Sequence, residues 1–363
     1  MLPLIVGVPT EIKDNENRVA ITPDGVRELE QHGVQVLVQS GAGIRSSITD
    51  EEYASAGAEI LSDVEELWAR SGIICKVKEP QASEYPYFRP GLVLFTYLHL
   101  AAYPQVAAAL LEHQVTGIAY ETVQAADGSL PLLAPMSEVA GRMATQIGAH
   151  LLERAHGGRG VLLGGAPGVR PGRVVVLGAG NVGWNAAWIA AGMEAEVLLL
   201  DKNLDRLRWV DQIHRGRIMT LASNRGAVER AVAGADLVIG AVLVAGGRAP
   251  TVVTEDMVVG MKERSVIVDV AIDQGGCVET IHETTHSDPT YVVHEVVHYA
   301  VGNIPGAVPH TSTYALTNAT LPYLLQLALG GEQAELSEPA LAGGLNTFAG
   351  RITHQAVAEA LDL

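Results

Sequence analysis

Short apolar runs alternate with segments of helical spacing along the chain. Strands are predicted where Val, Ile and Leu dominate, at residues 4–11, 34–43, 72–80, 91–100, 174–177, 196–201, 235–244 and 265–273. Helices are predicted where apolar residues recur every three or four positions, at residues 22–33, 50–60, 103–114 and 137–155. Thr22 should cap the first helix and Gly33 should end it. The alternation favours parallel βαβ units, and therefore an α/β fold.

One long segment, residues 304–331, contains no charged side chain. Its length would suit a membrane span, but three prolines, an asparagine and several threonines interrupt it. The sequence therefore predicts a loop followed by a buried helix.

Composition narrows the class of protein. The chain has 363 residues, enough for two domains, and combines 48% hydrophobic residues with 39 glycines, a mix that suits an α/β enzyme. The net charge of −17 argues against binding to nucleic acid or to an anionic membrane, because both need a cationic surface. Cys75 and Cys277 lack metal-ligand spacing, and the N-terminal run lacks the features of a signal peptide. We therefore expect buried thiols in a reducing cytoplasm.

The clearest motif is a glycine pattern between a strand and an Ala-rich helix, formed by Gly178, Gly180 and Gly183. The first glycine permits a tight turn, the second lets a pyrophosphate approach the backbone, and the third lets the helix pack on the strand. The helix N-terminus supplies amide donors to the anion. With a second strand following, this context predicts dinucleotide binding.

Asp201 ends that second strand, 18 residues after Gly183, and bears on the choice of cofactor. A carboxylate there can accept from both ribose hydroxyls of NAD and repels a 2′-phosphate. Lys202 and Arg206 lie nearby, and either could meet a phosphate, yet NAD is favoured. The alternative is that Asp201 only caps the turn after its strand.

Ligands of open α/β sheets bind at the carboxyl ends of the strands. Ser223, Val242, Leu243 and residues 270–276 should therefore line the nicotinamide half of the groove. Within the last of these segments, Asp273 is expected at a strand end, where a solvated turn carboxylate is the alternative to a functional acid.

A histidine, His99, lies inside the strand-like run of residues 91–100. Taken alone, it would be a core histidine whose nitrogens bond to the backbone. Counting by two places Phe95, Tyr97 and His99 on one face of the strand. Because imidazole titrates near neutral pH, His99 there would suit a reaction that makes or consumes a carbonyl group.

Several motifs, in the same order over nearly the whole chain, resemble those of bacterial alanine dehydrogenases. They are GVPTEIKDNENRVAITP (7–23), KVKEP (76–80), LFTYLHLA (94–101), LPLLAPMSEVAGRMATQIGA (130–149), VLGAGNVG (176–183), ADLVIGAVLV (235–244), VDVAIDQGG (268–276) and GNIPGAVPHTSTYALTNATLPY (302–323). The resemblance implies two Rossmann-like doubly wound domains joined by long helices, with the NAD domain (135–302) inserted in a substrate domain (1–134 and 303–363). It also implies a homohexamer that interconverts L-alanine and pyruvate plus ammonium with NAD.

The resemblance assigns roles to individual residues. His99 becomes the acid–base, Asp273 a second catalytic group, and Arg18 the clamp for the substrate carboxylate, which suits a guanidinium fork. Lys78 holds the carboxylate and polarises the carbonyl, although Lys76 could be the lysine concerned. Without the resemblance, Arg18 would be a solvated surface arginine and Lys78 an exposed strand-end lysine. Asn303 is also implied in substrate binding, and the implied cofactor-binding residues are Ser137, Gly178, Gly180, Asn181, Val182, Gly183, Asp201, Arg206, Ser223, Val242, Leu243, Val270, Ala271, Ile272, Asp273, Val301, Gly302, Asn303 and Ile304.

Three other functions are alternatives to this one. The NAD-binding part of proton-translocating transhydrogenase resembles this chain over the same length, but it passes hydride between nucleotides and needs no carboxylate anchor. A relative of saccharopine dehydrogenase would need a roomier pocket, and a noncatalytic NAD sensor would not need an acid, a base and a cation together.

Some members of the resembled family bind a metal through a carboxylate and a histidine on a late helix. The matching positions here are Gln326 and Gly330, so we predict no metal site. Ile304 replaces a methionine that is common in the family, a packing change that should be tolerated.

Overall fold

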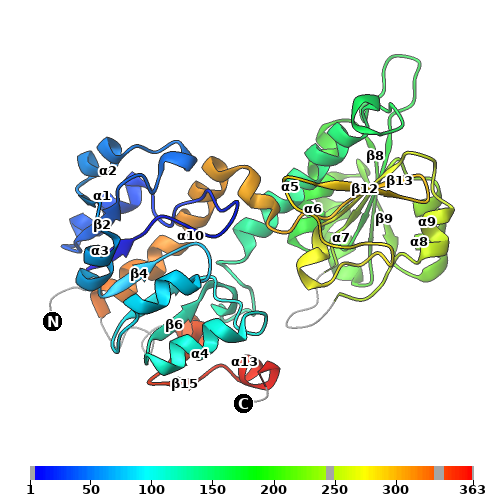
Figure 1. The fold of residues 1–363 in the computed structure, drawn as a ribbon. Helices are drawn as coiled ribbons and strands as arrows, with labels where there is room; N and C mark the ends of the chain where they lie inside the picture. The colour runs from blue at the N-terminus through cyan, green and yellow to red at the C-terminus, as the bar shows by residue number, and fades with distance from the viewer. Residues whose placement is uncertain (1–4, 243–248, 331–338, 362–363) are drawn as a thin grey trace. The chain divides into compact units, whose positions relative to one another are not determined.

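The chain folds as two α/β units, one inserted in the other (Figure 1). The computed structural model describes residues 5–242, 249–330 and 339–361. Unit 1 comprises Met1–Met136 and Val308–Leu363, and unit 2 comprises Ser137–Ala307. The predicted fold class, two doubly wound domains with one inserted in the other, is confirmed.

Unit 1 is built on an eight-stranded sheet in the order β15-β14-β6-β5-β4-β1-β2-β3. The strands from β3 to β6 run parallel, whereas β14 is antiparallel to both of its neighbours. The strands are β1 (Val6–Val8), β2 (Val36–Gln39), β3 (Glu59–Leu61), β4 (Ile73–Cys75), β5 (Val93–Thr96), β6 (Thr116–Ala119), β14 (Leu345–Phe348) and β15 (Arg351–Ile352). The C-terminal segment thus completes the edge of a sheet begun by the N-terminal one.

The helices predicted at residues 22–33 and 103–114 are present, whereas the one predicted at 50–60 ends at Ala56 and is followed by β3. Thr22 caps the first of them by accepting a hydrogen bond from the backbone N–H of Gly25, and Gly33 follows its end with φ +75°, as predicted. The helices are α1 (Pro23–Gln31), η1 (Ile44–Ser46), α2 (Asp50–Ala56), α3 (Val64–Arg70), η2 (Ala82–Tyr87), α4 (Pro104–Glu112), η3 (Tyr120–Thr122), α10 (Pro309–Gly330), α12 (Pro339–Gly344) and α13 (Gln355–Ala360).

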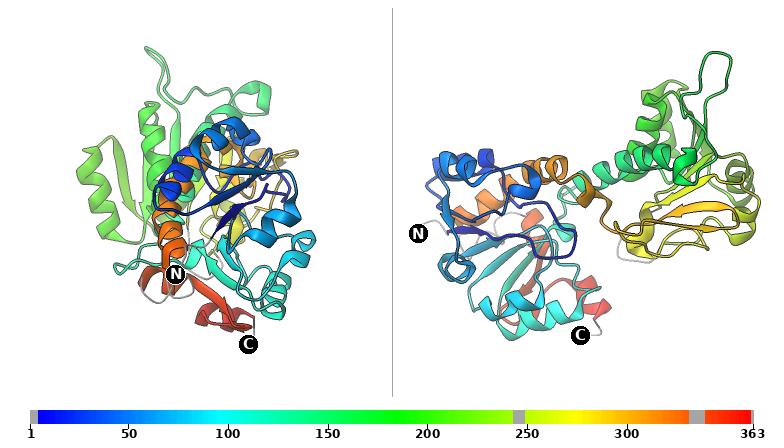
Figure 2. Two further views of the ribbon diagram at one scale, coloured as in Figure 1. Left: turned by 90° about the vertical axis from the view of Figure 1, so that its left-hand side faces the viewer. Right: turned by 45° about the horizontal axis from the view of Figure 1, so that its top comes forward.

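The uncharged segment at 304–331 forms a short η6 (Ile304–Ala307) and then α10. This helix packs beside α1 although the two are far apart in sequence (Figure 2). The hydroxyl of Thr313 on α10 accepts a hydrogen bond from the backbone N–H of Val19 at 3.1 Å and lies 2.9 Å from the hydroxyl of Ser46. The predicted helix is present, but it buries only part of its surface: Leu316 and Leu324 are buried, whereas Asn318 and Gln326 are exposed. No helix in the described parts of the chain is long and apolar enough to cross a membrane.

Unit 2 contains a seven-stranded sheet in the order β12-β13-β11-β10-β7-β8-β9. All strands except β12 run parallel. The strands are β7 (Arg173–Leu177), β8 (Glu196–Asp201), β9 (Ile218–Ala222), β10 (Leu237–Gly240), β11 (Val266–Asp269), β12 (Thr290–Val293) and β13 (Val296–Tyr299). Buried Val, Leu, Ile and Ala side chains fill both faces of this sheet, as expected for a parallel sheet covered by helices.

The helices of unit 2 flank this sheet (Figure 1). They are α6 (Asn181–Gly192), α7 (Leu204–His214), α8 (Arg225–Ala233), α9 (Glu255–Val259) and the short η5 (Val270–Gln274). The helix predicted at 137–155 is α5 (Ala134–Leu151), which begins earlier and ends sooner, and a separate turn, η4 (Arg154–His156), follows it. Cys75 and Cys277 are both free and buried, as predicted.

Candidate active site

Arg18 lies in the segment between β1 and α1, and its side chain is only 2% exposed. Its Nε donates to Oε1 of Glu16 at 2.6 Å, its Nη2 donates to the other carboxylate oxygen, and its Nη1 lies 3.0 Å from the sulfur of Met136. Burial alone would raise the pKa of Glu16, but the charge and hydrogen bonds of Arg18 lower it to about 2. The surface-arginine alternative is therefore wrong, and Arg18 is a fixed, buried cation.

The two lysines of the KVKEP motif have different surroundings. β4 ends at Cys75, so both lie beyond the strand rather than in it, contrary to the sequence-based expectation. Lys76 is 1% exposed and pairs with Glu11 at 3.3 Å and with Glu84 at 2.9 Å, which makes it part of a buried charge network. The Lys78 ammonium forms no ion pair or hydrogen bond with any residue that the structure describes.

The pKa of Lys78 also differs from that of Lys76, which is raised. Burial first, and then the positive charges of Arg18 and Lys13, lower the pKa of Lys78. The buried Arg18 and the partly buried Lys78 repel each other, and an anion near both cations would relieve that repulsion. This surrounding supports the choice of Lys78 over Lys76 for the carboxylate site.

His99 does not lie on a strand. β5 ends at Thr96, and His99 adopts a left-handed backbone conformation with φ +46° in the turn that follows. Counting by two along a strand was therefore wrong for this residue. Its side chain is 34% exposed, which also rules out the core-histidine alternative. The ring instead stacks parallel to that of Tyr97, with centroids 5.7 Å apart, and the Tyr97 hydroxyl donates to the carbonyl of Leu132.

A carboxylate that the sequence analysis missed, Glu121, holds this turn in place. It accepts hydrogen bonds from the backbone N–H groups of Leu98 at 3.2 Å and of His99 at 2.5 Å. One of its oxygens lies 3.8 Å from Nδ1 of His99. Its position follows directly from the topology, because β5 and β6 are parallel neighbours and Glu121 comes two residues after β6 ends. The sequence signal that could have identified Glu121 is a carboxylate placed just after the carboxyl end of a strand that pairs with β5.

In unit 2, the glycine pattern has the backbone geometry that the motif requires. Gly178 has φ +101°, and a Cβ there would lie 2.5 Å from the carbonyl oxygen of Ala241. A Cβ on Gly183 would lie 1.7 Å from the carbonyl oxygen of Gly178, so helix α6 packs directly on the turn. A Cβ on Gly180 would meet nothing closer than Nη1 of Arg206 at 3.9 Å. The space before the N-terminus of α6 is thus open to a diphosphate.

Asp201 caps backbone groups, as the alternative interpretation proposed. One carboxylate oxygen accepts from the N–H of Ala179 at 2.6 Å, and the other accepts from the N–H of Asn203 at 2.7 Å. Arg206 lies 3.9 Å away. Each carboxylate oxygen can accept more than one hydrogen bond, so capping and ribose binding are compatible.

Asp273 does not end a strand, contrary to the prediction. The strand-end acid is Asp269, a buried residue that accepts from the backbone N–H groups of Ala271 and Cys277 and so shapes the turn. Asp273 is exposed on η5, and its carboxylate approaches Gly302: a Cβ on Gly302 would lie 3.4 Å from Asp273 Oδ1 and 2.6 Å from Glu283 Oε1. The fold therefore brings Asp273 to the GNI segment, far away in sequence.

Most of the other predicted cofactor residues share one feature of the fold: they follow the carboxyl ends of neighbouring parallel strands of unit 2. These residues are Asn181, Val182, Ser223, Val242, Val270, Ala271, Ile272, Val301, Asn303 and Ile304. Ser137 lies on α5, and Leu243 lies outside the described residues. Which of them contact a nucleotide stays a prediction.

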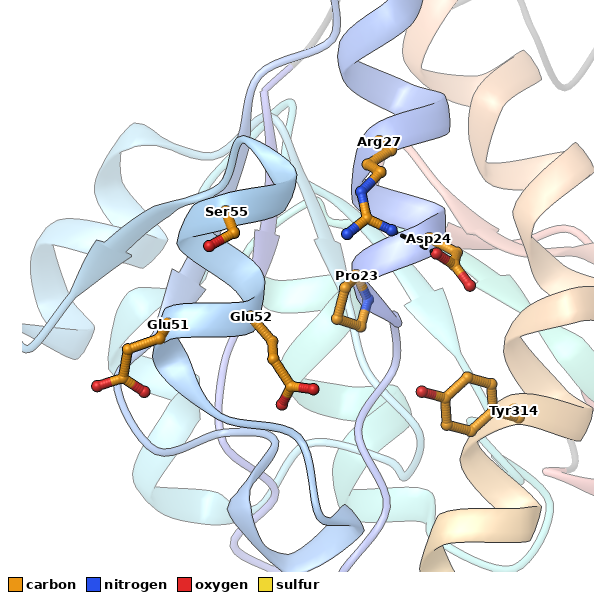
Figure 3. Close-up of a pocket in the computed structure, with 7 residues that line it drawn as sticks. All are labelled: Pro23, Asp24, Arg27, Glu51, Glu52, Ser55 and Tyr314. Carbon is orange, nitrogen blue, oxygen red and sulfur yellow. Dashed lines mark hydrogen bonds and ion pairs between the residues drawn. The ribbon is translucent and has the colours of Figure 1, made fainter.

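A pocket of about 320 Å³ elsewhere in unit 1 contains none of the predicted site residues (Figure 3). It lies between α1, α2 and Tyr314 of α10, and it is lined by acidic side chains and an ion pair of Arg27 with Asp24 at 2.6 Å. Its excess of carboxylates does not suit an anionic substrate.

Two family models together match most of the chain. The model for the Alanine dehydrogenase/PNT N-terminal domain matches residues 7–140, and the one for the Alanine dehydrogenase/PNT C-terminal domain matches residues 144–355. The chain belongs to the alanine dehydrogenase/PNT family. The resemblance noted in the sequence is thereby confirmed.

Within this family, the chain is similar over nearly its whole length to several proteins named alanine dehydrogenase. One from Methanococcus maripaludis is 57% identical over 362 residues, covering 99% of this chain and 97% of its own. One from Bacillus subtilis is 58% identical over 360 residues, covering 99% and 95%. A solved structure titled L-alanine dehydrogenase superposes with a TM-score of 0.97 at 50% identity, covering 99% of both chains. A transhydrogenase from Sinorhizobium meliloti shares the family fold, with a TM-score of 0.85 at 24% identity and coverage of 96% and 100%.

Proposed function

We propose that this protein is an NAD-dependent alanine dehydrogenase, which oxidatively deaminates L-alanine to pyruvate and ammonium and catalyses the reverse reductive amination. Identity of 54–58% to curated alanine dehydrogenases over 99% of the chain supports the reaction. The transhydrogenase alternative is weaker, because the 24% identity to the transhydrogenase structure shows only a shared fold.

The observation that carries the proposal is the pair of cations in unit 1, of which Arg18 is buried and Lys78 is partly buried. Arg18 is fixed by Glu16, whereas Lys78 has a lowered pKa and no ion-pair partner among the described residues. A 2-oxo or 2-amino acid presents a carboxylate to such a pair. The Lys78 ammonium can then polarise the adjacent carbonyl oxygen of pyruvate, which stabilises the negative charge that develops there.

His99 is the proposed proton donor and acceptor. Glu121 fixes its backbone, and the Tyr97 ring supports its imidazole, so the half-exposed ring keeps access to the substrate. In the amination direction, ammonia adds to pyruvate, water leaves the carbinolamine, and the resulting iminium is reduced. The addition of ammonia and the loss of water both move protons, whereas the reduction transfers a hydride, and imidazole can accept or donate a proton near neutral pH.

The cofactor site in unit 2 fits a dinucleotide. Gly180 leaves open space at the α6 N-terminus, whose free backbone N–H groups favour phosphate oxygens. NAD would accept the hydride in deamination, and NADH would donate it in amination. Asp201 would bind the adenosine ribose while it caps the turn through Ala179 and Asn203.

Replacing Asp201 by alanine should weaken NAD binding at least about tenfold, because a hydrogen bond to a charged group contributes roughly 1.5–3 kcal/mol. NADP binding should weaken far less, since the lost carboxylate would repel the 2′-phosphate. Titration of both cofactors, followed by fluorescence, measures the ratio. The melting temperature serves as a control for the lost capping bonds. Equal losses for NAD and NADP would mean that Asp201 only caps its turn.

The lowered pKa of Lys78 predicts the pH dependence of substrate binding. Above that pKa the ammonium loses its proton and one positive charge leaves the carboxylate site, so the KM for pyruvate should rise with pH. The rise in KM should begin at a pH below 10.5, the ordinary pKa of lysine, because the pKa of Lys78 is lowered. Initial rates between pH 7 and pH 10 test this. Lys78→Arg, which stays protonated, should flatten the rise even if its overall rate is lower; an identical profile would assign the effect to another group.

We further propose a cytoplasmic homohexamer with no nucleic-acid or membrane partner. Two free, buried thiols support the reducing cytoplasm, a net charge of −17 supports the lack of nucleic-acid and membrane partners, and the resemblance to the family implies the hexamer. Light scattering coupled to size-exclusion chromatography measures the mass of the assembly.

A further inference from the structure

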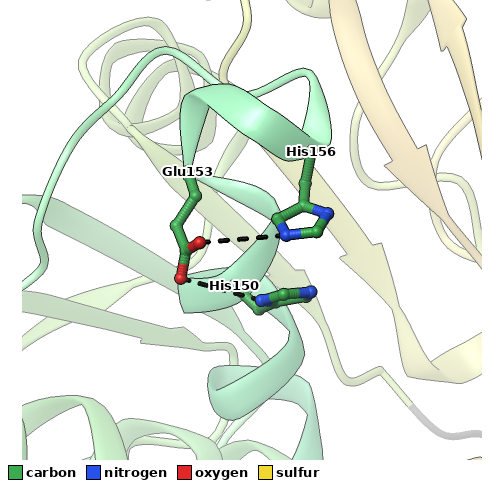
Figure 4. A group of neighbouring side chains, drawn as sticks. All are labelled: His150, Glu153 and His156. Carbon is green, nitrogen blue, oxygen red and sulfur yellow. Dashed lines mark ion pairs between the residues drawn. The ribbon is translucent and has the colours of Figure 1, made fainter.

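Two histidines and a glutamate cluster on the surface of unit 2, where α5 ends (Figure 4). Nδ1 of His150 lies 3.7 Å from Oε1 of Glu153, and Nε2 of His156 lies 3.8 Å from Oε2 of the same carboxylate. The ligand atoms of all three side chains lie within 4.8 Å of one another. None of the three has a role in the proposed dehydrogenase reaction.

We propose that His150, Glu153 and His156 bind one divalent transition-metal ion, with zinc as the best-matched case. Two imidazole nitrogens and a carboxylate oxygen are a common ligand set for Zn²⁺, Ni²⁺ and Cu²⁺. Bonds of about 2.0–2.1 Å in a tetrahedral site place ligand atoms about 3.3 Å apart. The separations of 3.7 and 3.8 Å run to different oxygens of Glu153, and the three ligand atoms lie within 4.8 Å of one another, so the exposed side chains need to close in by at most about 1.5 Å.

The backbone beneath the cluster is tightly fixed. The carbonyl of Glu153 accepts hydrogen bonds from the N–H groups of His156 at 3.0 Å and of Gly158 at 3.1 Å, and the N–H of Glu153 donates to the carbonyl of His150 at 3.1 Å. A Cβ on Gly158 would lie 2.1 Å from the carbonyl oxygen of Leu151, so the loop folds closely back on the helix end. This bonding holds the ligand-bearing residues close together before a metal arrives, which lowers the ordering cost of binding.

The charge around the cluster is mixed. The three side chains are 57%, 61% and 40% exposed, so water can complete the coordination shell. The C-terminal end of α5 carries a partial negative charge that favours a cation. Arg154 is exposed between two of the ligands, and Arg264 donates to the carbonyl of Gly157 at 3.4 Å. These two arginines act against the site and should limit its affinity.

This site departs from the sequence-based prediction of no metal. That prediction considered α10, where Gln326 and Gly330 offer no strong ligands. The present cluster joins the last turn of α5 to η4 instead. A metal bound only by the folded state stabilises it, so saturating Zn²⁺ should raise the melting temperature.

The test is a calorimetric titration of the untagged, full-length protein with Zn²⁺, and separately with Ni²⁺ and Mg²⁺. We expect one site for Zn²⁺ and Ni²⁺ that Glu153→Gln or His156→Ala weakens at least about tenfold, because even loss of an outer-shell partner costs 10–100-fold. Mg²⁺, which prefers oxygen ligands, should not compete. The matched control is His294→Ala, which removes an exposed histidine whose ion pair among the described residues is with Glu255, at 2.7 Å.

Two readouts separate a metal site from a merely structural cluster. The imidazole C–H resonances of His150 and His156, identified from the variants, should shift together as Zn²⁺ is added. The melting temperature should rise with Zn²⁺ in the parent protein and in His294→Ala, but not in His156→Ala. The proposal is overturned if His156→Ala and Glu153→Gln bind Zn²⁺ with the parent's affinity and stoichiometry, or if the His294→Ala control loses as much affinity as they do.

Discussion

Replacing His99 by alanine should lower turnover in both directions by at least about 10²-fold, because general acid–base catalysis contributes roughly 10²–10⁴-fold. NADH affinity should stay nearly unchanged, since His99 belongs to unit 1 and the glycine motif to unit 2. Steady-state rates with alanine and with pyruvate plus ammonium, together with NADH titration, separate the two effects.

A control for this experiment is His32→Ala. His32 is an exposed histidine in the same unit, and its ring bonds to the carbonyl of Glu28. The His32→Ala variant should leave all of these rates unchanged. If His99→Ala kept near-normal turnover, its imidazole would serve only the turn that Glu121 and Tyr97 hold together.

Asp273→Asn should remove ammonium-dependent NADH oxidation almost completely while NADH still binds. Amination of pyruvate has to lose water from a carbinolamine and passes through a cationic iminium, so it needs a second proton-transfer group and a negative charge in addition to His99. The variant keeps the shape of Asp273 and removes its basicity and charge. Direct reduction of glyoxylate or pyruvate to the hydroxy acid needs no amine chemistry and should survive as a slow reaction.

The structure provides a matched control for Asp273. Glu283 also directs its carboxylate towards Gly302, so Glu283→Gln removes a neighbouring charge without touching Asp273. NADH oxidation by both variants, with and without ammonium, is the measurement. Full ammonium-dependent activity in Asp273→Asn would reduce this residue to an exposed turn carboxylate. A loss in Glu283→Gln as large as in Asp273→Asn would assign the effect to the shared charge of the pair.

Some features of the site were visible in the sequence because they depend on local backbone geometry. Gly178 and Gly183 must be glycines wherever a strand turns this tightly into a helix, since a Cβ would collide with backbone oxygen atoms. Thr22 and Gly33 likewise mark the ends of a helix by short-range hydrogen bonding and backbone conformation. Such signals do not depend on how distant segments pack.

Other features could not be read from the sequence because partners from distant segments create them. Lys76 and Lys78 look alike in the motif, and only Glu11 and Glu84 distinguish the buried structural lysine from the other one. The strands of residues 91–100 and 265–273 were predicted too long. The sequence therefore placed His99 and Asp273 on strands. In the structure, His99 lies in a turn that Glu121 holds, and Asp273 lies on η5, whose N-terminus Asp269 caps.

The sequence by itself determined the α/β class, the nucleotide-binding motif and the family, because these depend on periodicity, glycine positions and ordered motifs. The tertiary structure decided the environment of each charged group. It buried Arg18 against Glu16, lowered the pKa of Lys78 by burial and by neighbouring cations, and brought Asp273 to Gly302. Burial and the distance between charges set these energies, and both arise only when segments far apart in sequence pack together.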